Sequence, residues 1–341
     1  MKTLVTGAAG FLGSHVAHEL VGRGESVRVL VRPSSDLRAL EGLDAERFDG
    51  DLRDRASLER ALEGVDRVFH VAADYRLWAR DPREIYESNV TGTQNLLDSA
   101  RRAEVSKFVY TSTVATIAVP QDGGLPNEET RASKSQMIGH YKRSKFEAEQ
   151  LALRAAETGL PVVIVNPTTP VGPGDWKPTP TGKIIVDFLN GRMPGYVDTG
   201  LNFVPVEDCA RGHLLAAEHG RTGERYILGG PNLTLKQMLD ILSLVSGLRA
   251  PRWKFPHVLA YAAGCVDMAF SRLMGRAPQI PLEGVRMARH KMFVDASTAQ
   301  RELGFAPGPV EAALGRAVAW YESNGYVAAG RARTTARARA A

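Results

Sequence analysis

Cysteine is scarce in this sequence, and metal-binding motifs are missing from it. Among the 341 residues only Cys209 and Cys265 are cysteines. Their separation does not fit the spacing of a zinc site, and one pair makes no disulfide framework. The sequence also contains no HExxH, CxxC, GKS or GKT motif. We therefore predict no metal site, and two reduced cysteines that serve as small buried hydrophobic residues.

Long hydrophobic runs are absent as well. The longest apolar stretch, residues 258–270, is interrupted by Asp267 and falls short of the roughly 20 residues that span a bilayer. A strand is expected from Lys2 onward, which leaves no room for a signal peptide. The sequence therefore predicts no transmembrane segment and a cytoplasmic location.

Excess charge of one sign is concentrated at the end of the chain. The formal net charge is +5. Four arginines lie in the last residues, namely Arg331, Arg333, Arg337 and Arg339, and without them the rest of the chain carries +1. A nucleic-acid-binding domain would carry a basic patch of its own. We predict no nucleic-acid partner, and we predict that residues 326–341 form a flexible Arg/Ala-rich tail.

Hydrophobic residues make up 44% of the sequence, and in the first half they form short runs that alternate with amphipathic segments. Strands are predicted at 2–6, 26–31, 107–113 and 161–167 and within 61–73, and helices at 11–23, 89–102 and 141–157. Alternating strands and helices indicate a parallel sheet covered on both faces. The predicted fold class is α/β, with a Rossmann-type doubly wound parallel sheet.

The second half is less regular and predicts a smaller region beside this domain. Residues 1–167 are assigned to a dinucleotide-binding domain, to which residues 202–230 return. Residues 168–201 and 231–325 are assigned to a smaller, mostly helical substrate-binding region. The first of these two segments is rich in Pro and Gly and is expected to be loop-rich. Thr234 is expected to cap a helix in the second.

Three glycines follow the first predicted strand at a spacing that suits a dinucleotide. Gly7 permits a tight turn, Gly10 lets the backbone approach a pyrophosphate, and Gly13 lets the helix and the strand pack closely. The helix begins with Phe11 and Leu12, and its N-terminus would face the phosphate charge. The alternative is a glycine-rich turn without a ligand. The position between a strand and a helix favours a nicotinamide dinucleotide site.

The residues after the next strands bear on which dinucleotide binds. Arg32 follows the second strand where an acidic residue would favour NAD, and an arginine there can pair with the 2′-phosphate of NADP. Arg38 could assist it. Asp51 and Leu52 follow the third strand and are placed to contact adenine. The alternatives are a solvated Arg32 and a plain turn at Asp51. We predict NADP, with NAD as the second possibility.

A tyrosine and a lysine four residues apart are the candidate catalytic pair. Tyr141 and Lys145 share one face of the predicted helix. A nearby ammonium is expected to lower the pKa of the phenol, so that Tyr141 can exchange a proton with a substrate hydroxyl. The alternative is a core tyrosine beside a solvated lysine. Residues 110–113, at the end of a strand, are candidates to orient the substrate oxygen.

With these features the chain resembles the extended short-chain dehydrogenase/reductase family, also called the NAD-dependent epimerase/dehydratase family. The motifs that carry the resemblance are TGAAGFLG (6–13), GDL (50–52), HVAA (70–73), NVTGTQNLL (89–97), VYTST (109–113), YKRSK (141–145), NPTTPVGPGD (166–175), NFVPVED (202–208) and ELGF (302–305). Within the family, the chain is most similar to dihydroflavonol 4-reductase-like proteins and hopanoid-associated sugar epimerases.

The resemblance implies roles for particular residues. It implies a catalytic triad of Thr113, Tyr141 and Lys145, with Ser112 as the alternative hydroxyl. It further implies that Asn89 holds backbone geometry, and that three residues line the cofactor, namely Ala72, Ala73 and, against the nicotinamide, Pro167. Family members often form homodimers through the helices equivalent to 89–102 and 141–157.

The substrate is less constrained by the sequence. The resemblance implies that members which bind nucleotide sugars carry an arginine before the NFVPVED strand, whereas residues 198–202 are not basic here. The alternative cations are Arg286, Arg289, His290 and Lys291. Residues 253–274 are rich in apolar side chains and form either a lid over an apolar substrate or an ordinary buried helix. Three hypotheses follow: an NADP(H)-dependent oxidoreductase acting on an apolar carbonyl or alcohol, a sugar epimerase, or a dinucleotide-sensing binding protein.

Overall fold

The computed structural model describes residues 1–118 and 124–328. Over these residues the chain separates into two compact units. Unit 1 comprises Met1–Thr168, Glu207–Leu228 and Asp295–Ala306. Unit 2 comprises Thr169–Val206, Gly229–Val294 and the residues from Pro307 onward.

Unit 1 is built on a seven-stranded sheet in which every pair of neighbouring strands is parallel. The strand order is β10-β6-β5-β4-β1-β2-β3. The strands are β1 (Lys2–Thr6), β2 (Ser26–Val31), β3 (Glu46–Asp49), β4 (Arg67–His70), β5 (Lys107–Thr111), β6 (Val162–Pro167) and β10 (Arg225–Leu228). From β1 the chain adds β2 and β3 on one side, and it then continues with β4 on the other side of β1. In α/β sheets, ligands bind at the carboxyl ends of the strands beside such a change in strand order. The predicted Rossmann-type fold is confirmed.

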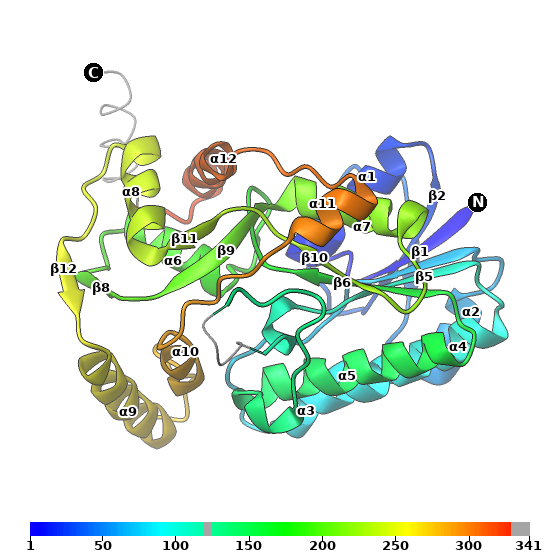
Figure 1. Ribbon diagram of the computed structural model, residues 1–341, viewed down its shortest axis with the longest axis horizontal. Coiled ribbons are helices and arrows are strands. Elements are labelled where there is room, and N and C mark those ends of the chain that lie inside the picture. The colour runs from blue at the N-terminus through cyan, green and yellow to red at the C-terminus, as the bar shows by residue number, and fades with distance from the viewer. Residues whose placement is uncertain (119–123, 329–341) are drawn as a thin grey trace. The chain divides into compact units, whose positions relative to one another are not determined.

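Helices cover both faces of this sheet (Figure 1). One face carries α1 (Phe11–Gly22), α7 (Val206–His219) and α11 (Ser297–Leu303), and the other carries α2 (Arg55–Ala61), α4 (Gly92–Arg102) and α5 (Gly139–Glu157). A short helix α3 (Arg83–Tyr86) and a π-helical turn (Glu87–Thr91) lead into α4. The central strands are therefore apolar along their length, because both faces are buried.

The boundaries of unit 1 differ from the predicted domain at two places. Residues 295–306 join unit 1, because Glu302 bonds with Arg221 and with the Tyr226 hydroxyl on the β10 side of the sheet. The return of the chain to unit 1 begins at Glu207 and not at residue 202, because β9 (Gly200–Pro205) pairs with strands of unit 2.

Unit 2 combines short strands with helices around a core of its own. β9 lies between β7 (Thr169–Val171) and β11 (Asn232–Thr234), and β8 (Gly195–Val197) pairs with β12 (Trp253–Phe255). Its core gathers side chains from α6 (Pro180–Leu189), α8 (Leu235–Ser246) and α12 (Val310–Ser323). Thr234 caps α8 as predicted, since its hydroxyl accepts a hydrogen bond from the Gln237 amide.

The expectation of a loop-rich segment up to residue 200 is wrong for its middle part. α6 begins there because the Thr179 hydroxyl accepts a hydrogen bond from Gly182 and Pro180 occupies the first turn, where a missing N–H costs nothing. The predicted tail also begins later than residue 326. Tyr326 donates a hydrogen bond to the Trp176 carbonyl, and Ala328 donates to Asn190. The four tail arginines lie outside the described residues.

The apolar segment 253–274 is not an ordinary buried helix. It contains most of α9 (His257–Leu273), which packs beside α10 (Leu282–Met287). Of the described residues from 243 to 293, no hydrophobic side chain is buried. Cys265 on α9 is exposed, contrary to prediction, whereas Cys209 is buried. None of the described helices has the length and apolar character needed to cross a bilayer.

Candidate active site

The turn between β1 and α1 contains two glycines at positions where a Cβ atom would clash with neighbouring backbone. Gly7 has a φ of +75°, and a Cβ there would lie 2.5 Å from the Ala72 amide nitrogen. A Cβ on Gly13 would lie 2.1 Å from the Gly7 carbonyl oxygen. The first turn of α1 therefore packs directly on the turn that precedes it, and this turn packs on the segment after β4.

The N-terminus of α1 is open to an anion. Gly10 is its N-cap in an extended conformation and is exposed, and no side chain of the described residues caps the helix. The amides of the first turn, including those of Phe11 and Leu12, carry the partial positive charge of the helix end. An uncapped helix start beside a Gly-lined turn fits the pyrophosphate of a dinucleotide.

The residues predicted to hold the adenosine end follow β2 and β3. Arg32 is exposed directly after β2 and has no ion pair among the described residues. Arg38 forms an ion pair with Asp36 instead of remaining available. Hydrogen bonds from Arg53 hold the pKa of Asp51 below its usual value. Arg32 is thus the cation best placed for a 2′-phosphate.

Leu52 follows Asp51 and is fixed by α4. Its carbonyl accepts a hydrogen bond from Asn95 at 3.0 Å. Gly92 faces it so closely that a Cβ there would approach the Leu52 Cβ to 2.8 Å. This close contact explains the glycine at the start of α4 and leaves Leu52 in a fixed position beside Asp51.

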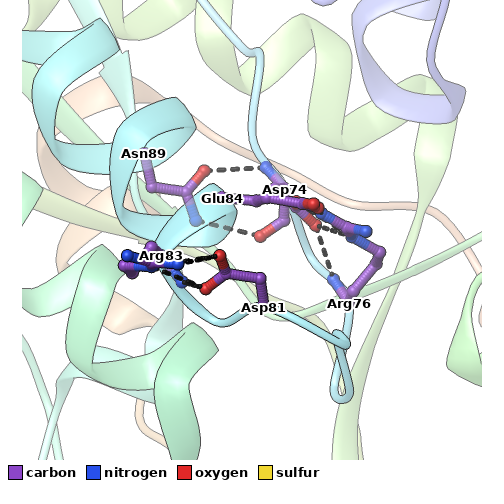
Figure 2. A network of polar contacts seen from close by, with 6 residues as sticks. All are labelled: Asp74, Arg76, Asp81, Arg83, Glu84 and Asn89. Carbon is purple, nitrogen blue, oxygen red and sulfur yellow. Dashed lines mark hydrogen bonds and ion pairs between the residues drawn. The ribbon is translucent and has the colours of Figure 1, made fainter.

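The segment after β4, which contains Ala72 and Ala73, is held by Asn89 (Figure 2). The Asn89 amide accepts from the Asp74 backbone N–H at 2.7 Å and donates to the Asp74 carbonyl at 2.9 Å. Asn89 also donates to the Ser144 hydroxyl on α5. The implied role of Asn89 in backbone geometry therefore corresponds to a contact with two elements of the site.

Ion pairs continue along the same loop. Arg76 bonds with the Asp74 carboxylate and with Glu84 at 2.8 Å, and Arg83 bonds with Asp81 (Figure 2). Because these pairs are largely exposed, each contributes little to stability. These pairs join the two ends of the loop from Asp74 to Glu84.

The three predicted catalytic residues converge at the carboxyl end of β5. Thr113 follows this strand, and its side chain is hydrogen-bonded to Tyr141. Lys145 is buried one helical turn further along α5, and its ammonium donates to the Tyr110 hydroxyl at 2.9 Å and to the Thr111 carbonyl at 2.7 Å. The hydroxyl pair and the lysine therefore share one end of the sheet, as the resemblance implies.

The choice between Ser112 and Thr113 has a geometric basis. The Ser112 hydroxyl is buried without a hydrogen-bond partner in the described structure. The Thr113 oxygen accepts a hydrogen bond from the Ala115 amide and contacts Tyr141. Thr113 is thus the hydroxyl that meets the phenol.

The charges of the pair differ from the prediction. Burial raises the pKa of Tyr141 to about 12, and the hydrogen bond from Thr113 opposes that rise. Burial lowers the pKa of Lys145 to about 7, while Glu149 opposes that shift. The expectation that Lys145 lowers the pKa of Tyr141 is wrong for the structure as it stands. The reason is that the ammonium bonds with Tyr110 and Thr111, so desolvation dominates at the phenol.

A buried carboxylate behind the site was not anticipated from the sequence. Glu149 accepts hydrogen bonds from the Thr116 hydroxyl and the Asn166 amide, each at 2.9 Å, and Arg225 lies 3.4 Å from it. Asn166 also donates to the Thr113 carbonyl. Glu149 stands four residues after Lys145 on α5, a spacing that could have indicated it. It holds the backbone that carries Thr113.

Pro167 ends β6 next to Asn166 and is buried. Its neighbour Thr168 bonds with the Leu228 carbonyl on β10. Pro167 therefore has a fixed place at the carboxyl edge of the sheet, within one residue of the Asn166 side chain that reaches Thr113. The described residues contain no group of three or more potential metal ligands.

The sequence matches the family described as "NAD dependent epimerase/dehydratase family" over residues 3–229. The chain belongs to this family. It is 45% identical over 327 residues to a "Putative dihydroflavonol 4-reductase" of Synechocystis sp., covering 95% of each chain. It is 38% identical to "Sterol demethylase protein B" of Methylococcus capsulatus, covering 96% of this chain and all of that protein.

A solved structure agrees with this assignment. The dTDP-glucose 4,6-dehydratase DesIV of Streptomyces venezuelae, a double mutant with NAD and DAU bound, is 27% identical and superposes with a TM-score of 0.76, covering 95% of this chain and 98% of that one. The chain is therefore an enzyme, an NAD(P)-dependent oxidoreductase of the extended short-chain dehydrogenase/reductase type that acts on small molecules.

Proposed function

We propose that the protein is an NADP(H)-dependent oxidoreductase that interconverts a carbonyl and a secondary alcohol on an apolar small molecule. The observation that carries the choice of NADP is Arg32. It is exposed at the carboxyl end of β2, in the position where NAD-binding sites carry an acid. A free guanidinium there matches a 2′-phosphate in charge and in hydrogen-bonding geometry.

The proposed chemistry assigns one task to each member of the triad. Thr113 and Tyr141 both bond with the substrate oxygen, and the phenol gives or takes its proton. The Lys145 ammonium, buried one helical turn away from Tyr141, is a second proton donor. NADP(H), when bound, would supply or accept the hydride at the substrate carbon that bears this oxygen. Ala72, Ala73 and Pro167 are assigned to the walls around the nicotinamide, and Gly7 and Gly10 to the pyrophosphate.

Two observations support an apolar substrate. The segment 198–202 contains no basic residue, and the two lysines that reach it, Lys254 and Lys291, are paired with its Asp198 and not available to a diphosphate. The relatives described as a dihydroflavonol 4-reductase and a sterol demethylase protein carry names of largely apolar ring compounds.

The test measures nicotinamide binding and turnover. NADPH should bind at least about tenfold more tightly than NADH by fluorescence titration, since one charged hydrogen-bonded pair contributes about 1.5–3 kcal/mol. Arg32→Ala should remove this preference. Arg154→Ala should keep it, because Arg154 is an exposed arginine near the C-terminal end of α5, away from the catalytic residues at its start. Equal binding of the two cofactors by the unaltered protein would refute the NADP assignment.

A sugar epimerase is the second candidate, because the family includes epimerases and the same Tyr141 and Lys145 would serve them. The two are separated by supplying ketones, aldehydes and nucleotide sugars in turn. A reductase consumes NADPH in proportion to product. Isomerised sugar without net NADPH consumption would establish the epimerase.

A homodimer formed through α4 and α5 stays a prediction, as does the cytoplasmic location.

A further inference from the structure

Helix α9 exposes an unusually large apolar surface. Val258, Val266 and Leu273 are 76%, 70% and 83% exposed, and Trp253 just before the helix is 74% exposed. Monomeric proteins rarely leave large aliphatic side chains together in water unless the surface binds something. The α9 face, defined as the exposed side chains of residues 253–274, therefore needs an occupant.

The exposed side chains lie on one side of the helix. At about 100° per residue, a continuous stripe of apolar residues falls within an arc of about 80°; it consists of Val258, Ala262, Val266, Ala269 and Leu273. Leu259 and Phe270 widen the arc to about 120°. The opposite side contains the buried Gly264 and Ser271. Gly264 faces α10, where a Cβ would lie 3.0 Å from Leu282.

The surroundings of this face are strongly basic. Residues 249–291 contain eight lysines and arginines against two carboxylates, Asp267 and Glu283. Asp198, which pairs with Lys254 and Lys291, is a third carboxylate here and leaves a formal net charge of +5. The chain as a whole carries +5. The positive charge is therefore not confined to the tail, because this segment of the body is basic as well. Arg252, Arg272 and Arg289 are exposed and form no ion pair among the described residues.

An apolar stripe with cations at both ends is the pattern of a helix that lies in a membrane interface. The aliphatic side chains enter the acyl boundary, and the arginines remain at the level of the head groups. A second copy of the chain is a poor occupant, because a two-fold pairing through this face would bring two basic surfaces together. We propose that the α9 face binds the surface of an anionic lipid bilayer without crossing it.

The test uses the full chain and vesicles. The protein should float with vesicles of phosphatidylcholine and phosphatidylglycerol, bind vesicles of phosphatidylcholine alone more weakly, and be released by salt. Combined Val266→Glu and Leu273→Glu substitutions should lower the partition coefficient at least about tenfold, since two apolar contacts are replaced by charges that the lipid repels. Leu244→Glu is the matched control, because Leu244 on α8 is 81% exposed outside the α9 face.

A second readout locates the contact. Trp253 should shift its emission to the blue and be quenched by brominated lipid, and Trp253→Phe should remove that change while flotation persists. Absence of flotation with anionic vesicles at low salt would overturn the proposal, as would equal flotation of the double variant and the unaltered chain. A dimer that the double variant converts to monomer, with vesicle binding unchanged, would assign the face to a second copy instead.

Discussion

At the scale of single residues, Lys145 shows how strongly burial controls charge in this site. The residue is 2% exposed, and among the described residues its ammonium donates to two neutral oxygens, the Tyr110 hydroxyl and the Thr111 carbonyl. The carboxylate of Glu149 opposes the effect of burial but does not cancel it, and the pKa of Lys145 falls to about 7. Near neutral pH the site therefore contains a lysine that can hold or release a proton.

This pKa makes folding stability depend on pH in a defined direction. Between pH 7 and 10.5 the unfolded chain binds the Lys145 proton and the folded chain does not, so the free energy of unfolding rises with pH across this range. Below pH 7 both states are charged and the cost of burying the charge is fully present. Lys145→Met removes that cost at every pH.

The measurement is denaturant unfolding of both proteins from pH 6 to 10.5. The stability of the unaltered protein relative to Lys145→Met should rise by a few kcal/mol over this range, which is the scale of a shift of this size. Titrating groups that do not interact with Lys145 cancel in the difference between the two proteins, and His70, whose pKa is lowered to about 3 by burial and by the Lys145 charge, titrates below this range. A difference that stays flat with pH would show that Lys145 keeps its ordinary pKa when folded.

At the scale of elements, the contact between the β1–α1 turn and the start of α1 decides whether the dinucleotide site forms. Gly13 leaves no room for a methyl group, because a Cβ would stand 2.1 Å from the Gly7 carbonyl oxygen. That oxygen also accepts the Gly10 N–H, which shapes the turn at the helix N-terminus. Any displacement of α1 therefore moves the amides that would meet the pyrophosphate.

Gly13→Ala should lower stability by about 1–3 kcal/mol through overpacking and weaken NADPH binding at least about tenfold. Gly22→Ala on the same helix is the matched control, since a Cβ at Gly22 meets nothing within 4 Å. The control should bind NADPH normally and be as stable as the unaltered chain or slightly more so. NADPH titration and thermal unfolding give both readings. Unchanged binding by Gly13→Ala would mean that α1 does not position the dinucleotide.

Some elements of this fold could be predicted from the sequence and others could not. The strands of unit 1 follow from buried apolar runs, and Gly7, Gly10 and Gly13 locate the cofactor loop, because these features depend on local chemistry. The abundance of Pro and Gly in 168–200 concealed α6, even though Thr179 and Pro180 are ordinary residues for a helix start. Whether α9 is buried could not be predicted, because exposure depends on which elements pack beside a helix.

The long-range parts of the site were also beyond sequence reasoning. Glu149 reaches Thr116 and Asn166 from a different element, and Lys145 turns to Tyr110 and not to Tyr141. Such contacts depend on how α5 lies against β5 and β6, which no spacing along the chain states. The residue types of the triad were predictable, while the direction of the pKa shift at Tyr141 required the surroundings.

At the scale of the whole molecule, each of the two units described has a hydrophobic cluster of its own. The core of unit 1 gathers residues from the central strands and helices, including Phe108. The core of unit 2 gathers α6, α8, α12 and Phe203 of β9. The Gly-rich turn, the triad and Arg32 all belong to unit 1. A dinucleotide should therefore stabilise one core directly.

Calorimetry should consequently resolve two unfolding transitions that respond to different changes. NADPH at about a hundred times its dissociation constant should stabilise the unit 1 transition by about 2.7 kcal/mol. Phe203→Ala should lower the unit 2 transition by about 3–5 kcal/mol, and Phe108→Ala should do the same to unit 1. A single transition that NADPH, Phe203→Ala and Phe108→Ala all shift would show that the two cores unfold as one, and that occupation of the dinucleotide site is felt throughout the chain.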